Sequence, residues 1–249
     1  MKESRMLMGM PITVEIVGQG DAVKDAVNKA FEYFQYVDDK FSVFKPNSEI
    51  TKINQGKIKE NERSDDIKLI FALSEQTKKE TNGYFDIVSR GGRLNPSGIV
   101  KGWAIWEVAK LIKGLGFKNF FVDAGGDIQA FGKNSEGEFW RIGIKNPFDQ
   151  KNIVKAVRLE NEGIATSGTY IRGQHIYNPF DKNKVISDIV SLSVIGPNVY
   201  EADRFATAAF AMGKSGLAFI ASRGNLEGYM IDKDGIATMT EGFNKYVIK

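Results

Sequence analysis

The spacing of apolar residues changes near Gly116, and this change constrains the fold more than any other feature of the sequence. Before it, a short alternating segment at Ile12, Val14 and Ile16 precedes segments in which apolar residues recur at the spacing of amphipathic helices. After it come short runs rich in β-branched and aromatic residues, separated by Gly, Asn or Pro. Separate groups of helices and strands, without regular alternation, predict an α+β fold rather than a doubly wound parallel sheet.

Helices are predicted in the N-terminal part from apolar faces and caps. Residues 22–37 carry Ala, Val and Phe at helical spacing, which gives that helix one buried face. Ser48 and Ser64 are expected to cap two further helices. A helix over residues 99–115 ends before Gly116, because Gly adopts the left-handed C-terminal conformation at little cost.

The remaining elements are mostly strands, with two helices near the C-terminus. The expected strands cover residues 12–16, 120–123, 128–131, 140–145, 154–159, 164–167, 189–195, 229–231 and 236–239, and the expected helices residues 198–212 and 215–223. No internal repeat, low-complexity tract or Pro/Ser-rich linker divides the chain. We therefore expect a single globular domain over residues 1–249.

Composition excludes several functional classes. The balance of 34 Lys and Arg against 31 Asp and Glu gives a net charge of +3, too small to indicate a nucleic acid partner. The absence of Cys excludes disulfide scaffolds, thiolate metal sites and thiol catalysis. Glu3, Ser4 and Arg5 interrupt the apolar run that a secretory signal needs, and no later run is long enough for a membrane span. We expect a cytoplasmic protein without membrane insertion; no sequence feature indicates its oligomeric state.

Two common nucleotide-binding signatures are incomplete. No G-x-G-x-x-G motif follows a predicted strand. Gly213-Lys214-Ser215 resembles the end of a P-loop, but Ala208 occupies the position of the first Gly and the segment follows a predicted helix. Rossmann and P-loop folds are therefore excluded.

The segment from Asn95 to Gly102 predicts an anion site. A turn through Pro96 leads into a helix whose first N–H groups have no partner within the helix, and Lys101 adds a positive charge. The residues alone leave a second interpretation open, a capped helix with a solvated Lys101.

Asp203 and Thr207 form a candidate metal pair. They stand four residues apart on one face of a predicted Ala-rich helix. A carboxylate and a hydroxyl can supply part of a Mg²⁺ shell, which carbonyls, water and ligand phosphates would complete. Asp and Thr at this spacing are also common on exposed helix surfaces, so this alternative stays open.

His175 is the only histidine of the chain. It follows a turn-rich link, residues 167–173, between two predicted strands. Imidazole is the natural general base near neutral pH. A solitary exposed histidine without a catalytic role is the alternative.

Seven segments, in this order, resemble the ApbE-type FAD:protein FMN transferases, also called flavin transferases. They are Met8-Gly9-Met10; Phe41-Ser42-Val43-Phe44 with Ser48-Glu49-Ile50 and Asn54; Gly83-Tyr84-Phe85-Asp86-Ile87; Ser97-Gly98 with Lys101-Gly102-Trp103-Ala104; Asp123-Ala124-Gly125-Gly126-Asp127; Ala165-Thr166-Ser167-Gly168 leading to His175; and Ala202-Asp203 with Ala206-Thr207. The segment from Thr166 to His175 is most similar to compact Gram-positive members.

The resemblance implies a T-fold-like mixed sheet core with packed helices, and a Mg²⁺-dependent reaction. FAD is cleaved at its pyrophosphate, FMN becomes joined to a Ser or Thr hydroxyl of an acceptor redox protein with an FMN-binding domain, and AMP leaves. The resemblance further implies roles for individual residues. The FAD site would include Met8, Phe44, Tyr84, Phe85, Asp86, Asn95, Lys101 and Tyr177; the Gly98 carbonyl, Asp203 and Thr207 would hold Mg²⁺; and His175 would deprotonate the acceptor hydroxyl.

Three positions depart from the usual family pattern. Asn95 and Asn178 stand where Asp is usual, which removes a negative charge but keeps an acceptor oxygen, and Met10 replaces Thr. Two alternative functions remain at this stage: an FAD pyrophosphatase that gives FMN and AMP, and a non-catalytic FAD-binding protein. AMP formation without an acceptor protein would identify the pyrophosphatase.

Overall fold

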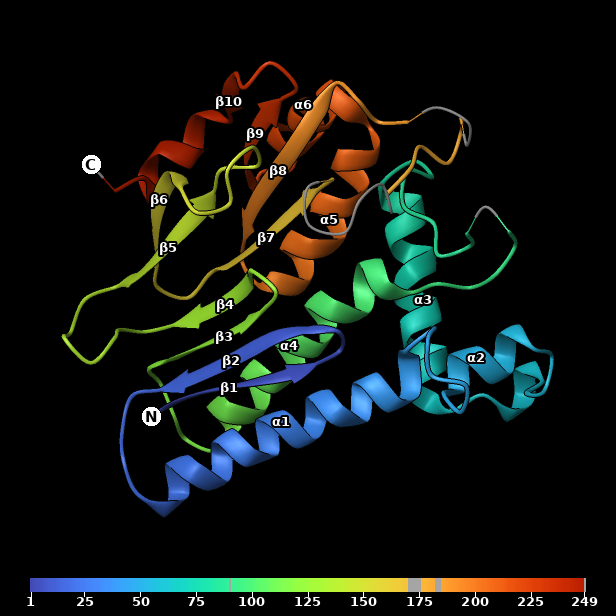
Figure 1. Ribbon diagram of the computed structural model, residues 1–249, viewed down its shortest axis with the longest axis horizontal. Helices are drawn as coiled ribbons and strands as arrows, with labels where there is room; N and C mark the ends of the chain where they lie inside the picture. The colour runs from blue at the N-terminus through green and yellow to red at the C-terminus, as the bar shows by residue number, and fades with distance from the viewer. Residues whose placement is uncertain (90, 170–175, 182–184, 249) are drawn as a thin grey trace.

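The computed structural model describes residues 1–89, 91–169, 176–181 and 185–248 (Figure 1). Within them, an antiparallel sheet of eight strands forms the centre of the molecule. In spatial order the strands are β1 (Lys2–Leu7), β2 (Met10–Ile16), β3 (Phe120–Ala124), β4 (Asp127–Phe131), β7 (Gly163–Gly168), β8 (Ile189–Gly196), β9 (Glu227–Asp232) and β10 (Ala237–Met239). The antiparallel pairing confirms the α+β prediction.

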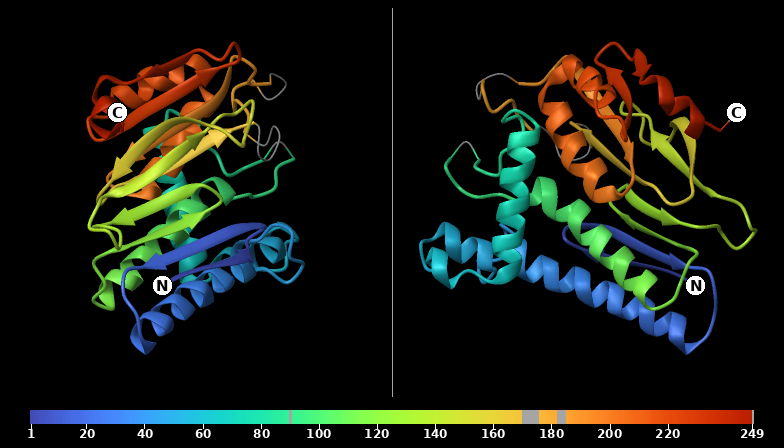
Figure 2. Two further views of the ribbon diagram at one scale, coloured as in Figure 1. Left: turned by 60° about the vertical axis from the view of Figure 1, so that its left-hand side comes forward. Right: turned by 180° about the vertical axis from the view of Figure 1, so that it is seen from behind.

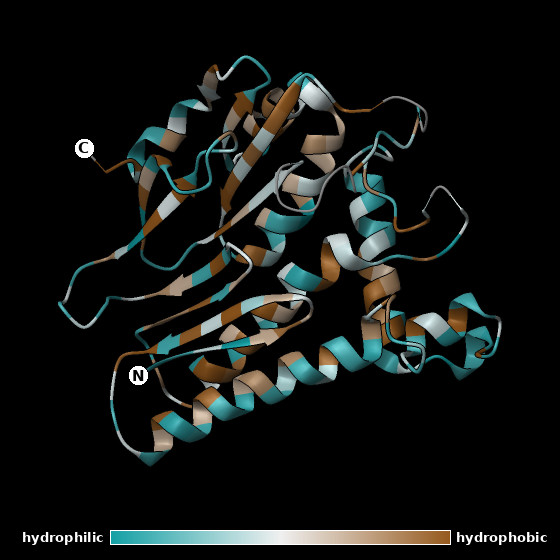
Figure 3. Cartoon of the chain, in the orientation of Figure 1, coloured by the Kyte–Doolittle hydropathy of each residue, from teal (hydrophilic) through white to brown (hydrophobic). Residues whose placement is uncertain are grey.

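Three helices cover one face of this sheet: α1 (Asp21–Phe41), α4 (Ser97–Gly114) and α5 (Val199–Ala211) (Figures 1 and 2). The alternation of buried and more exposed residues along β2 explains why the helices pack on this face. Ile12 and Val14 are fully buried toward the helices, while Thr13 and Glu15, which alternate with them, point to the opposite face. Hydrophobic and hydrophilic residues alternate along β2 and α1 in the hydropathy colouring (Figure 3).

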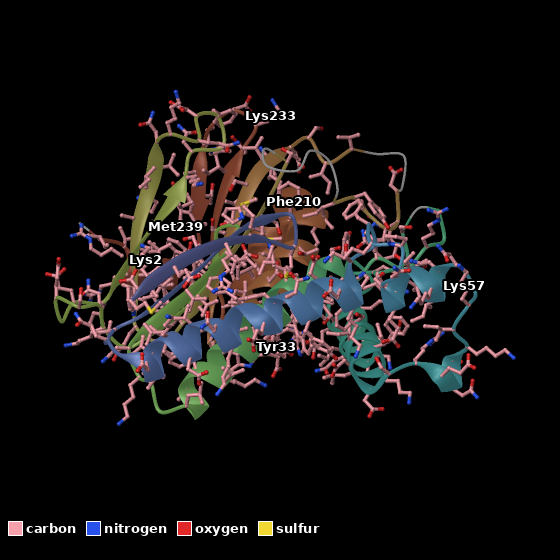
Figure 4. All side chains as sticks on the ribbon, turned by 60° about the horizontal axis from the view of Figure 1, so that its bottom comes forward. Lys2, Tyr33, Lys57, Phe210, Lys233 and Met239 are labelled. Carbon is pink, nitrogen blue, oxygen red and sulfur yellow. The ribbon has the colours of Figure 1, made fainter. Side chains whose placement is uncertain are left out.

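Two short elements, α6 (Gly216–Ala221) and the 3₁₀ turn η2 (Gly213–Ser215), extend this helical layer after α5. Phe210 of α5, labelled in Figure 4, is fully buried in that layer. Gly213 thus follows a helix rather than a strand, which confirms that the Gly-Lys-Ser segment is not a P-loop.

The opposite face is covered only in part. There β5 (Trp140–Lys145) and β6 (Ile153–Leu159) form a two-stranded ribbon, and the 3₁₀ helix η3 (Glu241–Tyr246) packs beside it. Trp140, Val157 and Phe243 share an apolar cluster with Ile128 of the main sheet. This apolar cluster therefore fixes the ribbon to the main sheet, and β5 lines a cavity together with residues of β2 and β3.

Helices α2 (Glu49–Asn54) and α3 (Asp65–Glu80), with the 3₁₀ turn η1 (Glu60–Glu62) between them, lie at one end of the molecule (Figure 1). Ser48 caps α2 as predicted, because its hydroxyl accepts from the N–H of Thr51 at 3.1 Å. Ser64 occupies the N-cap position of α3 as predicted, but its side chain makes no capping hydrogen bond. Its N–H and hydroxyl both donate to the Glu49 carboxylate at 2.7 Å, so Ser64 joins α3 to α2 instead.

Strand β1 was not predicted. It is an edge strand, and its charged and polar residues are largely exposed, so it lacks the apolar alternation on which strand prediction depends. Within the described part of the chain, no helix is long and apolar enough to cross a lipid bilayer.

Candidate functional site

A cavity of about 1050 Å³ lies on the partly covered face of the sheet. Its floor includes Thr13 of β2 and Asp123 of β3, and the ribbon strand β5 overhangs it. At its inner end it reaches the first turn of α4 and one face of α5. Small-molecule sites typically enclose ~300–1,000 Å³, so this cavity has room for a dinucleotide.

Most of the predicted site residues line this cavity, although they come from distant parts of the chain. They are Tyr84, Phe85, Asp86, Asn95, Gly98, Lys101, Tyr177, Asp203 and Thr207. The fold therefore gathers at one place the residues that the resemblance placed in the flavin and metal sites.

Two of the described predicted residues, Met8 and Phe44, are not among those that line the cavity. Met8 lies in the β1–β2 turn with a positive φ of 53°, next to Gly9 and Met10, which do line it. Phe44 follows α1 and its side chain is 93% exposed, so the structure gives no support to a flavin contact there. His175 lies outside the described residues.

Two glycines allow α5 to approach the first turns of α4 closely. A Cβ atom on Gly102 would lie 2.6 Å from the Cβ of Asp203, and one on Gly98 would lie 3.2 Å from Cγ2 of Thr207. The Gly102 N–H donates to Oδ2 of Asp203 at 2.8 Å. The absence of side chains at both glycines therefore brings the Asp203 carboxylate and the Thr207 hydroxyl against the start of α4.

Lys101 lies close to two carboxylates at this place. Its ammonium forms an ion pair with Oδ2 of Asp127 and lies 3.7 Å from Oδ1 of Asp203. Its side chain is 18% exposed, which rules out the solvated alternative, but its positive charge is balanced by two acidic groups. The expectation of an added positive charge at the start of α4 therefore needs correction. We call Lys101, Asp127 and Asp203 the Lys101 cluster.

The carboxyl group of Asp203 is strongly perturbed. Burial raises the pKa of Asp203 to about 7; the Lys101 ammonium opposes this rise, and the nearby Asp127 carboxylate adds to it. Two carboxylates for one ammonium leave this buried cluster short of positive charge. Such a cluster favours the arrival of a cation.

The donor set fits a magnesium ion. Asp203 and Thr207 supply oxygen atoms on one helix face, and Gly98 lies opposite them. Oxygen donors are those that Mg²⁺ prefers, and Mg²⁺ commonly takes only one or two carboxylates beside water and phosphate oxygens. Within the described residues, no three His, Cys, Asp or Glu side chains form a fuller metal cage.

The loop after α3 forms the aromatic wall of the cavity. Thr81 shapes it, because its hydroxyl accepts from the Phe85 N–H at 3.1 Å. Asp86 is held by an ion pair with Lys78 at 2.8 Å. The Tyr84 ring packs edge-on against the Phe180 ring, with 5.0 Å between the ring centroids. These contacts fix the conformation of the loop.

Two further contacts shape the entrance to α4. Oδ1 of Asn95 accepts from both the N–H and the hydroxyl of Ser97, at 3.2 Å and 2.6 Å. The Tyr177 hydroxyl donates to the carbonyl of Val88 at 3.0 Å. Asn95 therefore keeps the turn that an Asp would form there, without the negative charge.

A comparison with protein families now identifies the group to which the chain belongs. A family model described as "ApbE family" matches residues 8–91 and 88–230, most of the chain. The chain belongs to the ApbE family.

Named relatives agree with this assignment. The FAD:protein FMN transferase of Escherichia coli (strain K12) is 32% identical over 148 residues, which are 56% of this chain and 42% of that protein. The protein of that name from Salmonella typhimurium is 31% identical over 160 residues, 61% of this chain and 44% of its own length. The matched segments thus span less than half of these relatives.

Solved structures of the ApbE family share the whole fold. The flavin transferase ApbE from Vibrio cholerae superposes with a TM-score of 0.86 at 22% identity, covering 99% of this chain and 98% of that one. The ApbE protein of Thermotoga maritima gives a TM-score of 0.85 at 19% identity, covering 100% of this chain and 99% of that one.

Sequence reasoning gave no role to Asp127, which the structure places in the Lys101 cluster. One signal was available. Asp127 follows Gly125-Gly126 and opens a strand whose other residues are mostly apolar, so its charge is out of place in a buried strand.

Proposed function

We propose that this ApbE-family chain transfers FMN from FAD to a Ser or Thr hydroxyl of an acceptor protein and releases AMP. The observation that carries this proposal is the single cavity that brings the aromatic loop at Tyr84 and Phe85 together with the start of α4 and the Asp203–Thr207 pair. Relatives named FAD:protein FMN transferase support it.

FAD would occupy the cavity, with contacts from the residues that line it. The proposed ligands are Tyr84, Phe85, Asp86, Asn95, Lys101 and Tyr177. Contacts from Met8 and Phe44 remain predictions from the resemblance. The first turn of α4 would face the pyrophosphate, because helix N-termini present N–H groups to anions.

Magnesium would be held by Asp203, Thr207 and the Gly98 carbonyl. When bound there, it would stabilise the negative charge on the phosphate oxygens. The protein's own part would be to remove Asp203 from water and to hold it at the cavity that the ligand phosphates would occupy. Since the carboxyl group must be ionised to hold a cation, cation binding and proton loss at Asp203 are linked.

His175 would accept the proton of the acceptor hydroxyl. This role is supported by its sequence context and by the pKa range of imidazole. The acceptor would be a redox protein with an FMN-binding domain.

The test is an incubation of the protein with FAD, Mg²⁺ and an FMN-binding acceptor domain. We expect the acceptor to gain the mass of covalent FMN, and AMP to appear in equal amount. A parallel reaction without acceptor is the control. FMN and AMP formed there at the same rate would identify a pyrophosphatase, and FAD binding without turnover in either reaction would identify a binding protein.

A further inference from the structure

Asp127 is a buried carboxylate for which the proposed reaction gives no role. It is the first residue of β4 and is 1% exposed. Its Oδ1 accepts from the N–H of Thr166 on β7 at 3.0 Å, while Oδ2 faces the ammonium of Lys101. Asp127 thus connects two central strands with α4 at the inner end of the cavity.

The Lys101 ammonium is shared unequally between the two carboxylates. It is in direct contact with Asp127, but it lies 3.7 Å from the nearest oxygen of Asp203. The other Asp203 oxygen accepts from the Gly102 N–H. The geometry therefore draws the positive charge of Lys101 away from the residue proposed to hold the cation.

We propose that Asp127 is a positioning residue, which holds the Lys101 ammonium away from Asp203 and so keeps the Asp203 carboxylate available to a divalent cation. This inference rests on the cation site of the proposed function. An ammonium in contact with Asp203 would neutralise that carboxylate and repel an arriving Mg²⁺. Asp127 prevents this competition by offering Lys101 a nearer partner.

The first test is the substitution Asp127→Asn. The Asn side chain keeps the shape and an oxygen acceptor for the Thr166 N–H, but it loses the charge that attracts Lys101. Lys101 then pairs with Asp203. We expect the dissociation constant for Mg²⁺, measured by calorimetry without FAD, to rise roughly 10–100-fold, as is usual when a partner of a metal ligand is lost.

A matched control comes from a second Asp–Lys pair, in which Asp232 is buried, Lys214 is largely exposed, and neither residue lines the cavity. Asp232 is 6% exposed, accepts from the N–H groups of Asp234 and Ile236, and lies 3.3 Å from Lys214. Asp232→Asn removes the same charge from a buried aspartate outside the cavity. We expect it to leave the Mg²⁺ dissociation constant within about twofold of wild type.

A rescue experiment separates positioning from a merely structural role. In the double variant Asp127→Asn with Lys101→Met, the competing ammonium is gone, so the Mg²⁺ affinity should recover relative to Asp127→Asn alone. Recovery supports the inference. Wild-type affinity in Asp127→Asn, or no recovery in the double variant, overturns it.

A third variant distinguishes this failure from failure of the proposed site. Asp203→Asn should abolish the Mg²⁺ binding that wild type shows. If Asp203→Asn binds Mg²⁺ like wild type, the cation site itself is wrong, and the inference about Asp127 falls with it. If only Asp203→Asn loses the cation and Asp127→Asn does not, the site stands and the inference alone is wrong.

Discussion

Two ionic clusters start from neighbouring residues of α5 and have the same charge count, yet they differ in their surroundings. Each combines one cation with two carboxylates. They are the Lys101 cluster (Lys101, Asp127, Asp203) and the Arg204 cluster (Arg204, Glu80, Glu201). The first lines the cavity, and the second joins α5 to the end of α3.

In the Arg204 cluster both carboxylates are well satisfied. The guanidinium donates to Glu80 with one nitrogen and to Glu201 with the other, the latter at 2.7 Å. It also donates to the Thr77 hydroxyl at 3.2 Å. Burial opposes ionisation of Glu80, but hydrogen bonds from Gln76 and Arg204 leave its pKa below the usual value.

The contrast shows that the form of the cation and the degree of burial decide what a cluster can do. Arginine reaches two carboxylates through separate nitrogens, whereas the single ammonium of Lys101 favours one and leaves Asp203 with a raised pKa. The glutamates of the Arg204 cluster are also partly exposed to water. One cluster therefore links two helices, and the other is the cluster that we propose accepts a further positive charge.

The largest effect is expected from removing the carboxylate of the Lys101 cluster that faces the cavity. Asp203→Ala should abolish FMN transfer and should weaken FAD binding only when Mg²⁺ is present, because metal and FAD support each other's binding. Thr207→Ala should do less, since a neutral hydroxyl contributes less than a carboxylate. FAD titrations with and without Mg²⁺ measure this. Transfer by Asp203→Ala with an unchanged Mg²⁺ requirement contradicts the assignment.

The next effect concerns His175, which belongs to neither cluster. His175→Ala should reduce FMN transfer by roughly 10²–10⁴-fold, the usual effect of losing a general base. FAD and Mg²⁺ affinities should change little, because the Lys101 cluster is intact. Rates and affinities measured on the same preparation check this. A transfer rate near that of wild type would mean that another group takes the proton.

A smaller effect, on stability rather than chemistry, is expected at the Arg204 cluster. Arg204→Met should lower the free energy of unfolding by about 3 kcal/mol, because it leaves Glu80 and Glu201 without their shared partner. Lys214→Met, which breaks an ion pair of a largely exposed lysine, should cost less than about 1 kcal/mol. Urea unfolding measures both. If Arg204→Met keeps wild-type stability but loses Mg²⁺ affinity, the separation of the two clusters is wrong.

Only part of the Lys101 cluster could be predicted from the sequence. The spacing of Asp203 and Thr207 predicted their common face, and both line the cavity. The partners of Lys101 were not predictable, because Asp127 and Asp203 come from a strand and a helix that only the tertiary fold brings to α4. Charge pairing between distant elements leaves no periodic signal in a sequence.

Helices and strands with strong apolar patterns were predicted within a few residues, as for β5, where prediction and structure agree at residues 140–145. The failures have physical causes in the tertiary structure. Strand β1 is an exposed edge strand without apolar alternation, and Ser64 donates to Glu49 although its position is that of a cap. In both cases neighbouring elements, rather than local propensity, determine the outcome.

The smallest effect is a pH dependence that distinguishes the two clusters in the absence of metal. The folded-state pKa of Asp203, about 7, lies above its ordinary value of 3.8, so the folded protein binds this proton more tightly than the unfolded chain. The stabilisation of the fold by this bound proton is complete below pH 3.8, and it is lost as the pH rises through about 7. Asp203→Asn lacks this dependence. The free energy of unfolding of Asp203→Asn, relative to that of wild type, should therefore rise by at least about 1.4 kcal/mol between pH 5 and pH 8. This is the equivalent of one pKa unit.

Urea unfolding at both pH values, with EDTA present, measures this gain. The comparison needs Glu80→Gln as its counterpart, because the pKa of Glu80 is lowered in the folded state. Glu80 therefore stabilises the fold above its ordinary pKa of 4.5 and loses this contribution only as the pH falls below it. Its substitution should give the same change in stability at pH 5 and pH 8, within error. Equal pH dependence in the two variants would show that the carboxylates of the Lys101 cluster are as well paired as those of the Arg204 cluster. Asp203 would then not be available to bind a cation.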